Sequence, residues 1–161
     1  METAVNFLLD GAPLIGERVA VFGQGVVGLL TTALLARLPL ASLTTFDKFP
    51  LRREWSQKFG ASSADLRGLK DLGGLEGDLI YELTGSPAAL DDAISAAGFS
   101  ARIVVGSWYG EKRHAVDLGG KFHRARLKLI SSQVSTLTPE LHARWSKARR
   151  LAVAWQMLEA V

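Results

Sequence analysis

The sequence predicts an α/β fold in which a doubly wound, mainly parallel sheet carries helices on both faces. Strand-like apolar stretches alternate with helical patterns along the chain, and such alternation is typical of right-handed βαβ crossovers, which build parallel sheets. The 161 residues are 48% hydrophobic and 22% charged and include 16 glycines. This length and composition predict one globular domain, residues 1–161, with a single core.

Apolar periodicity and the residues that interrupt it place the elements in order. Pro50 suits the first turn of a helix that Gly60 ends, and Pro87 suits the first turn of the next helix. The predicted strands cover residues 17–22, 42–46, 78–83, 102–105 and 127–131, and the predicted helices cover residues 3–10, 29–38, 52–59, 88–97 and 139–161. Residues 61–77 are rich in Gly, Asp and Ser, which indicates loops and a short strand. The sheet and its crossovers would therefore occupy residues 17–135.

The last predicted helix, residues 139–161, has Thr138 as its expected N-cap. Its apolar side chains recur at steps of three and four, which is the spacing of one helix face. They are Leu141, Trp145, Ala148, Ala152, Trp155 and Leu158. We therefore expect both tryptophans to anchor this helix in the core.

The turn between the first predicted strand and its helix carries most of the functional interpretation. Gly23 allows a tight turn, Gly25 lets the backbone approach a ligand, and Gly28 brings the helix close to the sheet. No charged residue precedes Arg37 in that helix, so the amides of its first turn can face an anion. A turn of this kind cradles the pyrophosphate of a dinucleotide, although the glycine spacing alone also occurs in strand–helix connections that bind nothing.

An acidic residue strengthens the dinucleotide interpretation. Asp47 follows the second predicted strand, 19 residues after Gly28, close to the spacing of about 20 residues expected for the carboxylate that binds the adenosine ribose. Its charge favours NAD over NADP, because the 2′-phosphate of NADP would be repelled. The neighbouring Lys48, Arg52 and Arg53 would offset that repulsion, so NADP remains a second expectation.

Two further strand ends carry small residues. Gly85 follows the strand at 78–83, and Gly106 and Ser107 follow the strand at 102–105. In an open parallel sheet the ligand crevice lies outside the carboxyl ends of the strands. We therefore expect these residues to lie beside the glycine turn and Asp47.

Composition argues against several other classes of protein. The chain has no cysteine, which excludes disulfides and thiolate zinc sites and weakly favours the cytoplasm. The N-terminus lacks a basic segment, and no apolar stretch has the length of a bilayer span, so neither secretion nor a membrane is predicted. The formal charge of +3 and the basic clusters suit a solvated surface better than a nucleic-acid interface. The three histidines show no metal-ligand spacing.

Catalytic motifs of single-domain enzymes are also missing. A short-chain dehydrogenase needs a Tyr-x-x-x-Lys pair, but Tyr109 is followed at that offset by Arg113 and Tyr81 by Gly85. A G-x-S-x-G nucleophile elbow is absent as well. A class I methyltransferase, which also uses a glycine turn and a ribose-binding acid, is the second candidate, and the third glycine at position 28 argues against it.

A succession of short motifs spans residues 3 to about 135. In order, these motifs are the helix that begins at Thr3-Ala4, Gly16-Glu17-Arg18-Val19, the turn at residues 23–28, Asp47, Phe59-Gly60-Ala61, Glu82-Leu83-Thr84-Gly85-Ser86-Pro87 and Arg102-Ile103-Val104-Val105-Gly106. Together they closely resemble the cofactor domain of zinc-type alcohol dehydrogenases, in the medium-chain dehydrogenase/reductase superfamily. The resemblance implies a Rossmann fold with a six-stranded sheet.

The resemblance also implies roles for individual residues. The backbone amides of Gly25, Val26 and Val27 would bind the pyrophosphate. Asp47 would hold the ribose hydroxyls, and Arg52 would lie beside the adenosine. Lys48 is a further expected cofactor-binding residue. The other half of the cofactor would be bordered by Thr84, Gly85, Gly106 and Ser107. In the same family the last strand of the sheet pairs across a two-fold axis, which implies a homodimer through residues 127–131.

One departure from the family limits the functional expectation. The domain that supplies catalytic zinc in these enzymes has no counterpart in this sequence, so we expect an NAD(H)-binding domain that binds no zinc and is inactive alone, with the missing catalytic domain as its partner. A stand-alone dinucleotide-binding module is the alternative. Because substrate-selecting residues would lie in the missing domain, the substrate cannot be predicted.

Overall fold

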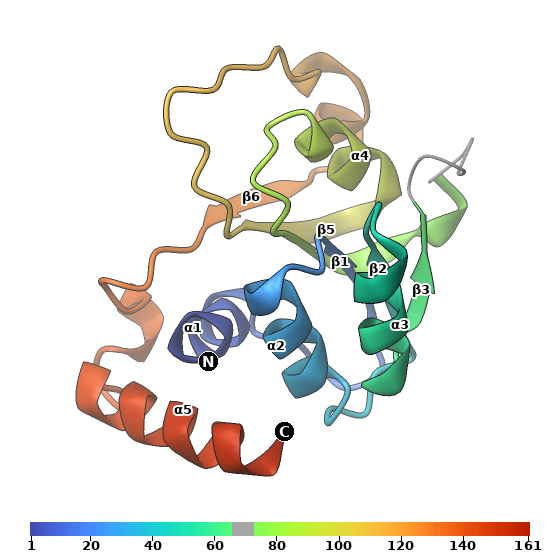
Figure 1. Ribbon diagram of the computed structural model, residues 1–161. Coiled ribbons are helices and arrows are strands. Elements are labelled where there is room, and N and C mark those ends of the chain that lie inside the picture. The colour runs from blue at the N-terminus through green and yellow to red at the C-terminus, as the bar shows by residue number, and fades with distance from the viewer. Residues whose placement is uncertain (66–72) are drawn as a thin grey trace.

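A computed structural model describes residues 1–65 and 73–161 of the chain (Figure 1). The described residues form a six-stranded sheet in the order β3-β2-β1-β4-β5-β6, in which every strand pairing is parallel. The strands are β1 (Arg18–Phe22), β2 (Ser42–Phe46), β3 (Ser62–Ala64), β4 (Gly77–Glu82), β5 (Ala97–Val105) and β6 (Lys128–Ser131). The predicted doubly wound Rossmann architecture is confirmed.

Helices pack on both faces of the sheet. The α-helices are α1 (Glu2–Gly11), α2 (Val26–Leu35), α3 (Pro50–Lys58), α4 (Ala89–Ala96) and α5 (Lys147–Ala160). Short helical turns occur at η2 (Gly73–Leu75), η3 (Leu118–Phe122) and η4 (Pro139–Leu141). Of the predicted loop segment 61–77, β3 and η2 are described, and residues 66–72 lie outside the described residues.

Strand alternation sorts the core side chains between two layers. Val19 and Val21 of β1 pack with α1 and α2, whereas Ala20 and Phe22 of the same strand pack with α4. Successive strand side chains point to opposite faces of a sheet, so a strand buried on both faces is apolar at every position. This explains the continuous apolar run that ends at the glycine turn.

The fifth strand is longer and less regular than predicted. It begins at Ala97, directly after α4, and its register with β4 shifts between the pairs Gly77–Ala97 and Leu79–Arg102. Ser100 lies within the shift and has a φ of 59°, in the left-handed region that marks an irregular strand position. Regular pairing resumes at Arg102 and reaches Val105, so the carboxyl end of the strand lies beside those of its neighbours.

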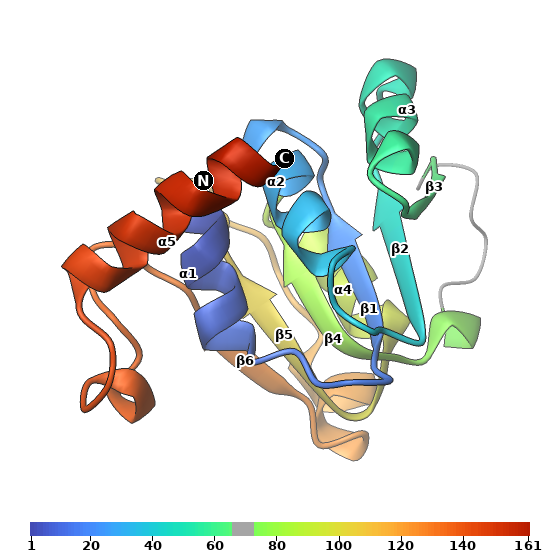
Figure 2. The ribbon, with the colours of Figure 1, turned by 90° about the horizontal axis from the view of Figure 1, so that it is seen from below.

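The predicted helix at 139–161 is wrong in its extent and in its buried face. The chain forms the short η4, then a separate helix, α5, whose N-cap is Ser146. Figure 2 shows α5 lying beside α1. It buries Ala154, whereas Trp155 is 62% exposed and Leu151 and Leu158 are exposed.

A buried arginine explains which face of α5 turns inward. Arg150 is only 2% exposed. Its guanidinium pairs with Glu2 at 2.9 Å and donates to the side chain of Asn6 and to backbone carbonyls of residues 134 and 136. Beside the predicted stripe, this helix carries a second apolar stripe, formed by Val153, Ala154 and Met157, which packs against α1. The ion pair and hydrogen bonds of Arg150 favour burial of this second stripe. The tryptophans are therefore not core anchors: Trp155 is exposed, and Trp145 is half-buried with Arg149 4.4 Å above its ring.

None of the helices in residues 1–65 and 73–161 combines the length and the apolar content that a membrane span requires.

Candidate functional site

The glycine turn lies at the carboxyl end of β1 and is closely packed. Gly23 has a φ of 90°, and a Cβ atom there would lie 2.6 Å from the carbonyl oxygen of Leu83. A Cβ atom at Gly28 would lie 2.0 Å from the carbonyl oxygen of Gly23. These are distances that no side chain tolerates, so Gly23 makes the turn and Gly28 lets α2 approach it, as the sequence predicted.

The next glycine leaves open space at the start of α2. Gly25 is the N-cap of this helix, and no described atom outside its own chain neighbours lies within 4 Å of a Cβ atom built there. Val26 and Val27 follow in the first turn and are exposed. The first amides of a helix have no intrahelical acceptor, so this end of α2 offers donors to an anion.

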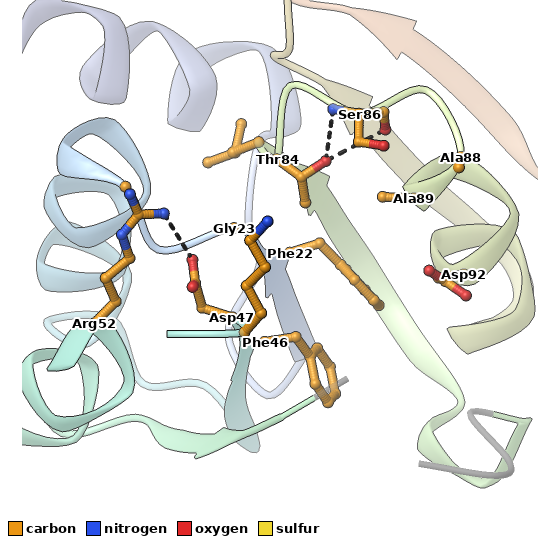
Figure 3. A pocket seen from close by; sticks show the side chains of 13 residues that line it. Phe22, Gly23, Phe46, Asp47, Arg52, Thr84, Ser86, Ala88, Ala89 and Asp92 are labelled. Carbon is orange, nitrogen blue, oxygen red and sulfur yellow. Dashed lines mark hydrogen bonds and ion pairs between the residues drawn. The ribbon is translucent and has the colours of Figure 1, made fainter. Parts of the chain in front are cut away.

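A cavity of about 550 Å³ opens beside the turn, across the carboxyl ends of β1, β2 and β4. Among its lining residues are Gly23, Gly25, Asp47, Lys48, Arg52 and Thr84, all of them predicted site residues. In Figure 3, Asp47 and Arg52 face each other on one side, and Thr84 and Ser86 lie on the other. Its size fits part of a dinucleotide, since ligand pockets commonly measure about 300–1,000 Å³.

A second cavity of about 270 Å³ adjoins the first, because Leu83 and Thr84 line both. Four more predicted site residues line this second cavity: Val27, Gly85, Gly106 and Ser107. Trp108 lines it as well, and its side chain is 90% exposed. As the described residues define them, neither cavity is lined by Val26 or Gly28. The structure thus brings ten of the twelve predicted residues to two adjoining cavities at one edge of the sheet.

Asp47 makes hydrogen bonds within the protein that its predicted role, holding the ribose, does not require. One carboxylate oxygen accepts the amide of Gln24 at 2.7 Å, and the other accepts the amide of Phe49 at 2.8 Å. The Arg52 guanidinium lies 3.4 Å from the carboxylate, whose side chain is buried. Asp47 therefore fixes the glycine turn against the end of β2, in addition to lining the cavity.

Basic side chains flank this acid. The Arg52 guanidinium stacks 4.5 Å from the centre of the Phe49 ring, and the Lys48 ammonium lies 5.0 Å from the same ring. Arg53 instead donates to the backbone carbonyl of Asp47 and pairs with Asp65. Lys48 and Arg52 both line the cavity, and cationic groups there would attract phosphate oxygens.

Sequence reasoning missed a polar cluster behind the second cavity. Glu82, the last residue of β4, is fully buried. Its carboxylate accepts hydrogen bonds from Tyr109 and from the backbone and side chain of Thr84. Burial and the adjacent Glu82 carboxylate raise the pKa of the Tyr109 hydroxyl, which stays protonated as a donor. A glutamate directly after the buried run at residues 79–81 was the available signal.

Asp92 is another lining residue that the sequence did not single out. Burial raises the pKa of its carboxyl, and the neighbouring charge of Asp91 adds to the effect. No group of three or more histidine, aspartate or glutamate side chains in the described ranges is placed to hold a metal ion. The chemistry of the site is therefore that of a cleft with anion-binding donors and a buried acid.

Comparisons with solved structures match this architecture over almost the whole chain. Galactitol-1-phosphate dehydrogenase of Escherichia coli superposes with a TM-score of 0.79 over 98% of this chain and 48% of its own, at 20% identity. An alcohol dehydrogenase of E. coli CFT073, complexed with NADH, gives 0.79 over 99% and 45%, also at 20% identity. This chain has the fold of the cofactor-binding half of zinc-type dehydrogenases. A proposed zinc-binding dehydrogenase of Sinorhizobium meliloti 1021, bound to NADP, gives 0.78 over 97% and 46% at 16% identity.

Sequence relatives agree with this similarity. L-threonine 3-dehydrogenase of Bacillus velezensis is 32% identical in an alignment 107 residues long that covers 62% of this chain and 31% of that enzyme. D-guloside 3-dehydrogenase of E. coli K12 is 23% identical in an alignment 163 residues long, gaps included, that covers 96% of this chain and 47% of the enzyme. No protein-family model matches the chain. The chain thus spans half or less of the length of these curated relatives, and the resemblance to the cofactor domain of zinc-type alcohol dehydrogenases is confirmed.

Proposed function

We propose that this chain is the NAD(H)-binding domain of a zinc-type alcohol dehydrogenase-like oxidoreductase and does not catalyse a reaction alone. The observation that carries the proposal is the pair of adjoining cavities along the carboxyl ends of the strands, beginning at the glycine turn. That is the place where open α/β sheets bind nucleotides. The whole oxidoreductase would need a catalytic domain as a partner, which would supply the substrate site.

The cavities suit the two halves of the cofactor. The adenosine would lie in the larger cavity, with its ribose near Asp47 and its phosphates near Arg52 and the start of α2. There the amides of Gly25, Val26 and Val27 would bind the pyrophosphate, with Lys48 as a further cation. The nicotinamide half would lie in the smaller cavity, beside Thr84, Gly85, Gly106 and Ser107.

The carboxylate of Asp47 supports NAD over NADP. A 2′-phosphate charge about 4 Å from it would meet a repulsion of about 4 kcal/mol at an effective dielectric constant of 20. The Arg52 guanidinium, 3.4 Å from the same carboxylate, opposes this repulsion. Of the structural neighbours, one is complexed with NADH and one is bound to NADP, so the choice for this chain depends on Asp47 and the cations beside it.

The test is a titration of the chain with NADH and NADPH, followed by calorimetry and by tryptophan fluorescence. We expect NADH to bind more tightly than NADPH and to quench Trp108, which lines the smaller cavity. The variant Trp108→Phe separates the signals, because it should lose most of the quenching and still give a calorimetric isotherm. Absence of binding at millimolar NADH would refute the proposal, and preferential binding of S-adenosylmethionine would favour the methyltransferase.

Activity measurements address the second part of the proposal. The isolated chain should show no NAD-dependent oxidation of alcohols, because the proposal assigns the substrate site to a separate catalytic domain. Turnover by the isolated chain would show that its own residues are sufficient. A stand-alone dinucleotide-binding module would also bind NADH without turnover. It differs from the proposed domain because it needs no catalytic domain as a partner.

We also propose a homodimer through the outer edge of β6. This strand pairs only with β5 among the described strands, and an unpaired edge is a template for a further strand. Pairing of two copies across a two-fold axis would remove both free edges. Sedimentation should give a dimer, and a monodisperse monomer would contradict the pairing.

A further inference from the structure

We propose that Glu82 is a positioning residue of the cofactor site, and that it acts through Tyr109 and Thr84 to hold the two loops around the smaller cavity. The inference rests on the proposed function, since it concerns how the nicotinamide half of the cofactor is received. Glu82 itself lines neither cavity in the part of the chain that the structure describes. Its effect on a ligand would therefore pass through its neighbours.

The position of Glu82 in the sheet makes it a link between strands. It ends β4, the strand that lies between β1 and β5, and it is in register with Phe22 and Val105 at their carboxyl ends. The loops that begin at Thr84 and Gly106 leave the sheet directly beside it. A rigid group at this point contacts both loops without occupying either cavity.

The carboxylate is buried at a cost that its hydrogen bonds offset. One oxygen accepts the Thr84 amide at 2.8 Å and the Thr84 hydroxyl at 2.5 Å, and the other accepts the Tyr109 hydroxyl at 2.5 Å. A buried carboxylate is strongly destabilising unless such donors surround it. Three donors from two loops thus fix both the carboxylate and the loops.

Further hydrogen bonds tie the same loops together. The Ser107 hydroxyl accepts the Gly85 amide at 2.8 Å and lies 3.3 Å from the Glu82 carbonyl oxygen, to which it donates. The Lys112 ammonium donates to the Gly85 carbonyl at 2.8 Å. These contacts hold residues 84–87 against residues 106–112, which are the segments that border the smaller cavity.

The hydrogen bonds around Glu82 also fix the chain on both sides of Trp108. It lies between Ser107 and Tyr109, both of which are anchored at Glu82, yet its own side chain is 90% exposed at the cavity. An aromatic side chain held at a cavity mouth by its chain neighbours offers a flat surface for a ring. Loss of the Tyr109 anchor would leave the ring of Trp108 without a fixed orientation.

The experiment compares two ligands on the 161-residue chain. NADH would use both cavities, whereas ADP lacks the nicotinamide and the ribose attached to it and would depend on the larger cavity alone. Removal of a hydrogen bond to a charged group costs about tenfold or more in an equilibrium constant, so we expect Tyr109→Phe to weaken NADH binding by about that factor. We expect the affinity for ADP to change by less than about twofold.

Glu82→Gln is a second variant, in which the side chain keeps its size and loses its charge. An amide group replaces one acceptor oxygen with a donor, which conflicts with the Thr84 donors or reverses the bond to Tyr109. The same selective loss of NADH affinity is expected, with altered quenching of Trp108. Tyr81→Phe is the matched control, because no partner within the described residues reaches the Tyr81 hydroxyl, and it should leave both affinities unchanged.

The outcomes separate this inference from the proposed function. If the unaltered chain binds neither ligand, the proposed function fails. If the unaltered chain binds both, but Tyr109→Phe weakens both equally or weakens neither, the positioning role is wrong. If Glu82→Gln does not fold, Tyr109→Phe still decides, because that change leaves Glu82 and its two bonds from Thr84 in place.

Discussion

Replacing single glycines of the turn by alanine should separate folding from binding. At Gly28 the added methyl carbon would lie 2.0 Å from the Gly23 carbonyl oxygen, a backbone atom that cannot rotate away. Alanine gains about 1 kcal/mol over glycine within a helix, but overpacking costs about 1–3 kcal/mol or more. Because this contact is with backbone in a constrained turn, we expect Gly28→Ala to lose about 2 kcal/mol of unfolding free energy in balance.

Gly25→Ala should have the opposite effect: it should weaken NADH binding without destabilising the fold. Its φ of −67° and ψ of −176° suit any residue, and no described atom outside its own chain neighbours lies within 4 Å of the added carbon. Replacing glycine in an unstrained position stabilises by about 0.4–1 kcal/mol through the unfolded chain. The methyl group would nevertheless project into the space proposed for the pyrophosphate, so NADH affinity should fall by about tenfold or more, which corresponds to about 1.4 kcal/mol.

Urea unfolding and NADH calorimetry measure the two effects. Gly74→Ala is the control, because an added carbon there also meets no described atom within 4 Å and the residue lines neither cavity. Unchanged stability in Gly28→Ala would show that α2 does not pack against the turn as described. Unchanged NADH affinity in Gly25→Ala would refute the close approach of the backbone to the phosphates.

Three further predictions concern stability. Arg150→Met should lower the unfolding free energy by about 3 kcal/mol, because it leaves the buried Asn6 oxygen and the partly exposed Glu2 carboxylate without this partner. The exposed Arg149→Met should cost under about 1 kcal/mol, and equal losses in urea titrations would contradict the role of Arg150. Burial raises the pKa of the Asp10 carboxyl in the folded chain. The stability that the protonated carboxyl contributes is therefore fully present below the unfolded-state pKa of about 3.9, and it is lost as the pH rises through the folded-state pKa. Asp10→Asn should therefore gain stability relative to the unaltered chain as pH rises, and a difference independent of pH would be inconsistent with this assignment. Trp155→Ala should cost under about 1 kcal/mol, since only buried tryptophans lose about 3–5 kcal/mol, and a larger loss in thermal unfolding would mean that its ring is covered.

The fold and most of the site could be predicted because both depend on local patterns. Parallel strands place their carboxyl ends at one edge, so the positions of Gly23, Asp47 and Gly106 in sequence already predicted their proximity. The roles of Gly23 and Gly28 follow from backbone geometry alone. These features need no knowledge of distant contacts.

The parts that could not be predicted depend on partners far apart in sequence. Tyr109 reaches Glu82 across 27 residues, and Arg150 reaches Glu2 across 148. Sequence periodicity identified an apolar stripe on the last helix, but that helix carries a second stripe, and the pairing of Arg150 decided between them. Helical spacing alone holds no information about which stripe finds a polar partner.

The strand order has a consequence for biosynthesis. Of the six strands, β1 is made first, yet it lies inside the sheet between β2 and β4, and the two cavities draw on residues from Thr3 to Trp108. A ligand stabilises only a state that can bind it. The complete nucleotide site therefore forms only after β5 and the loop that follows it have left the ribosome, because Gly106, Ser107 and Trp108 line the smaller cavity.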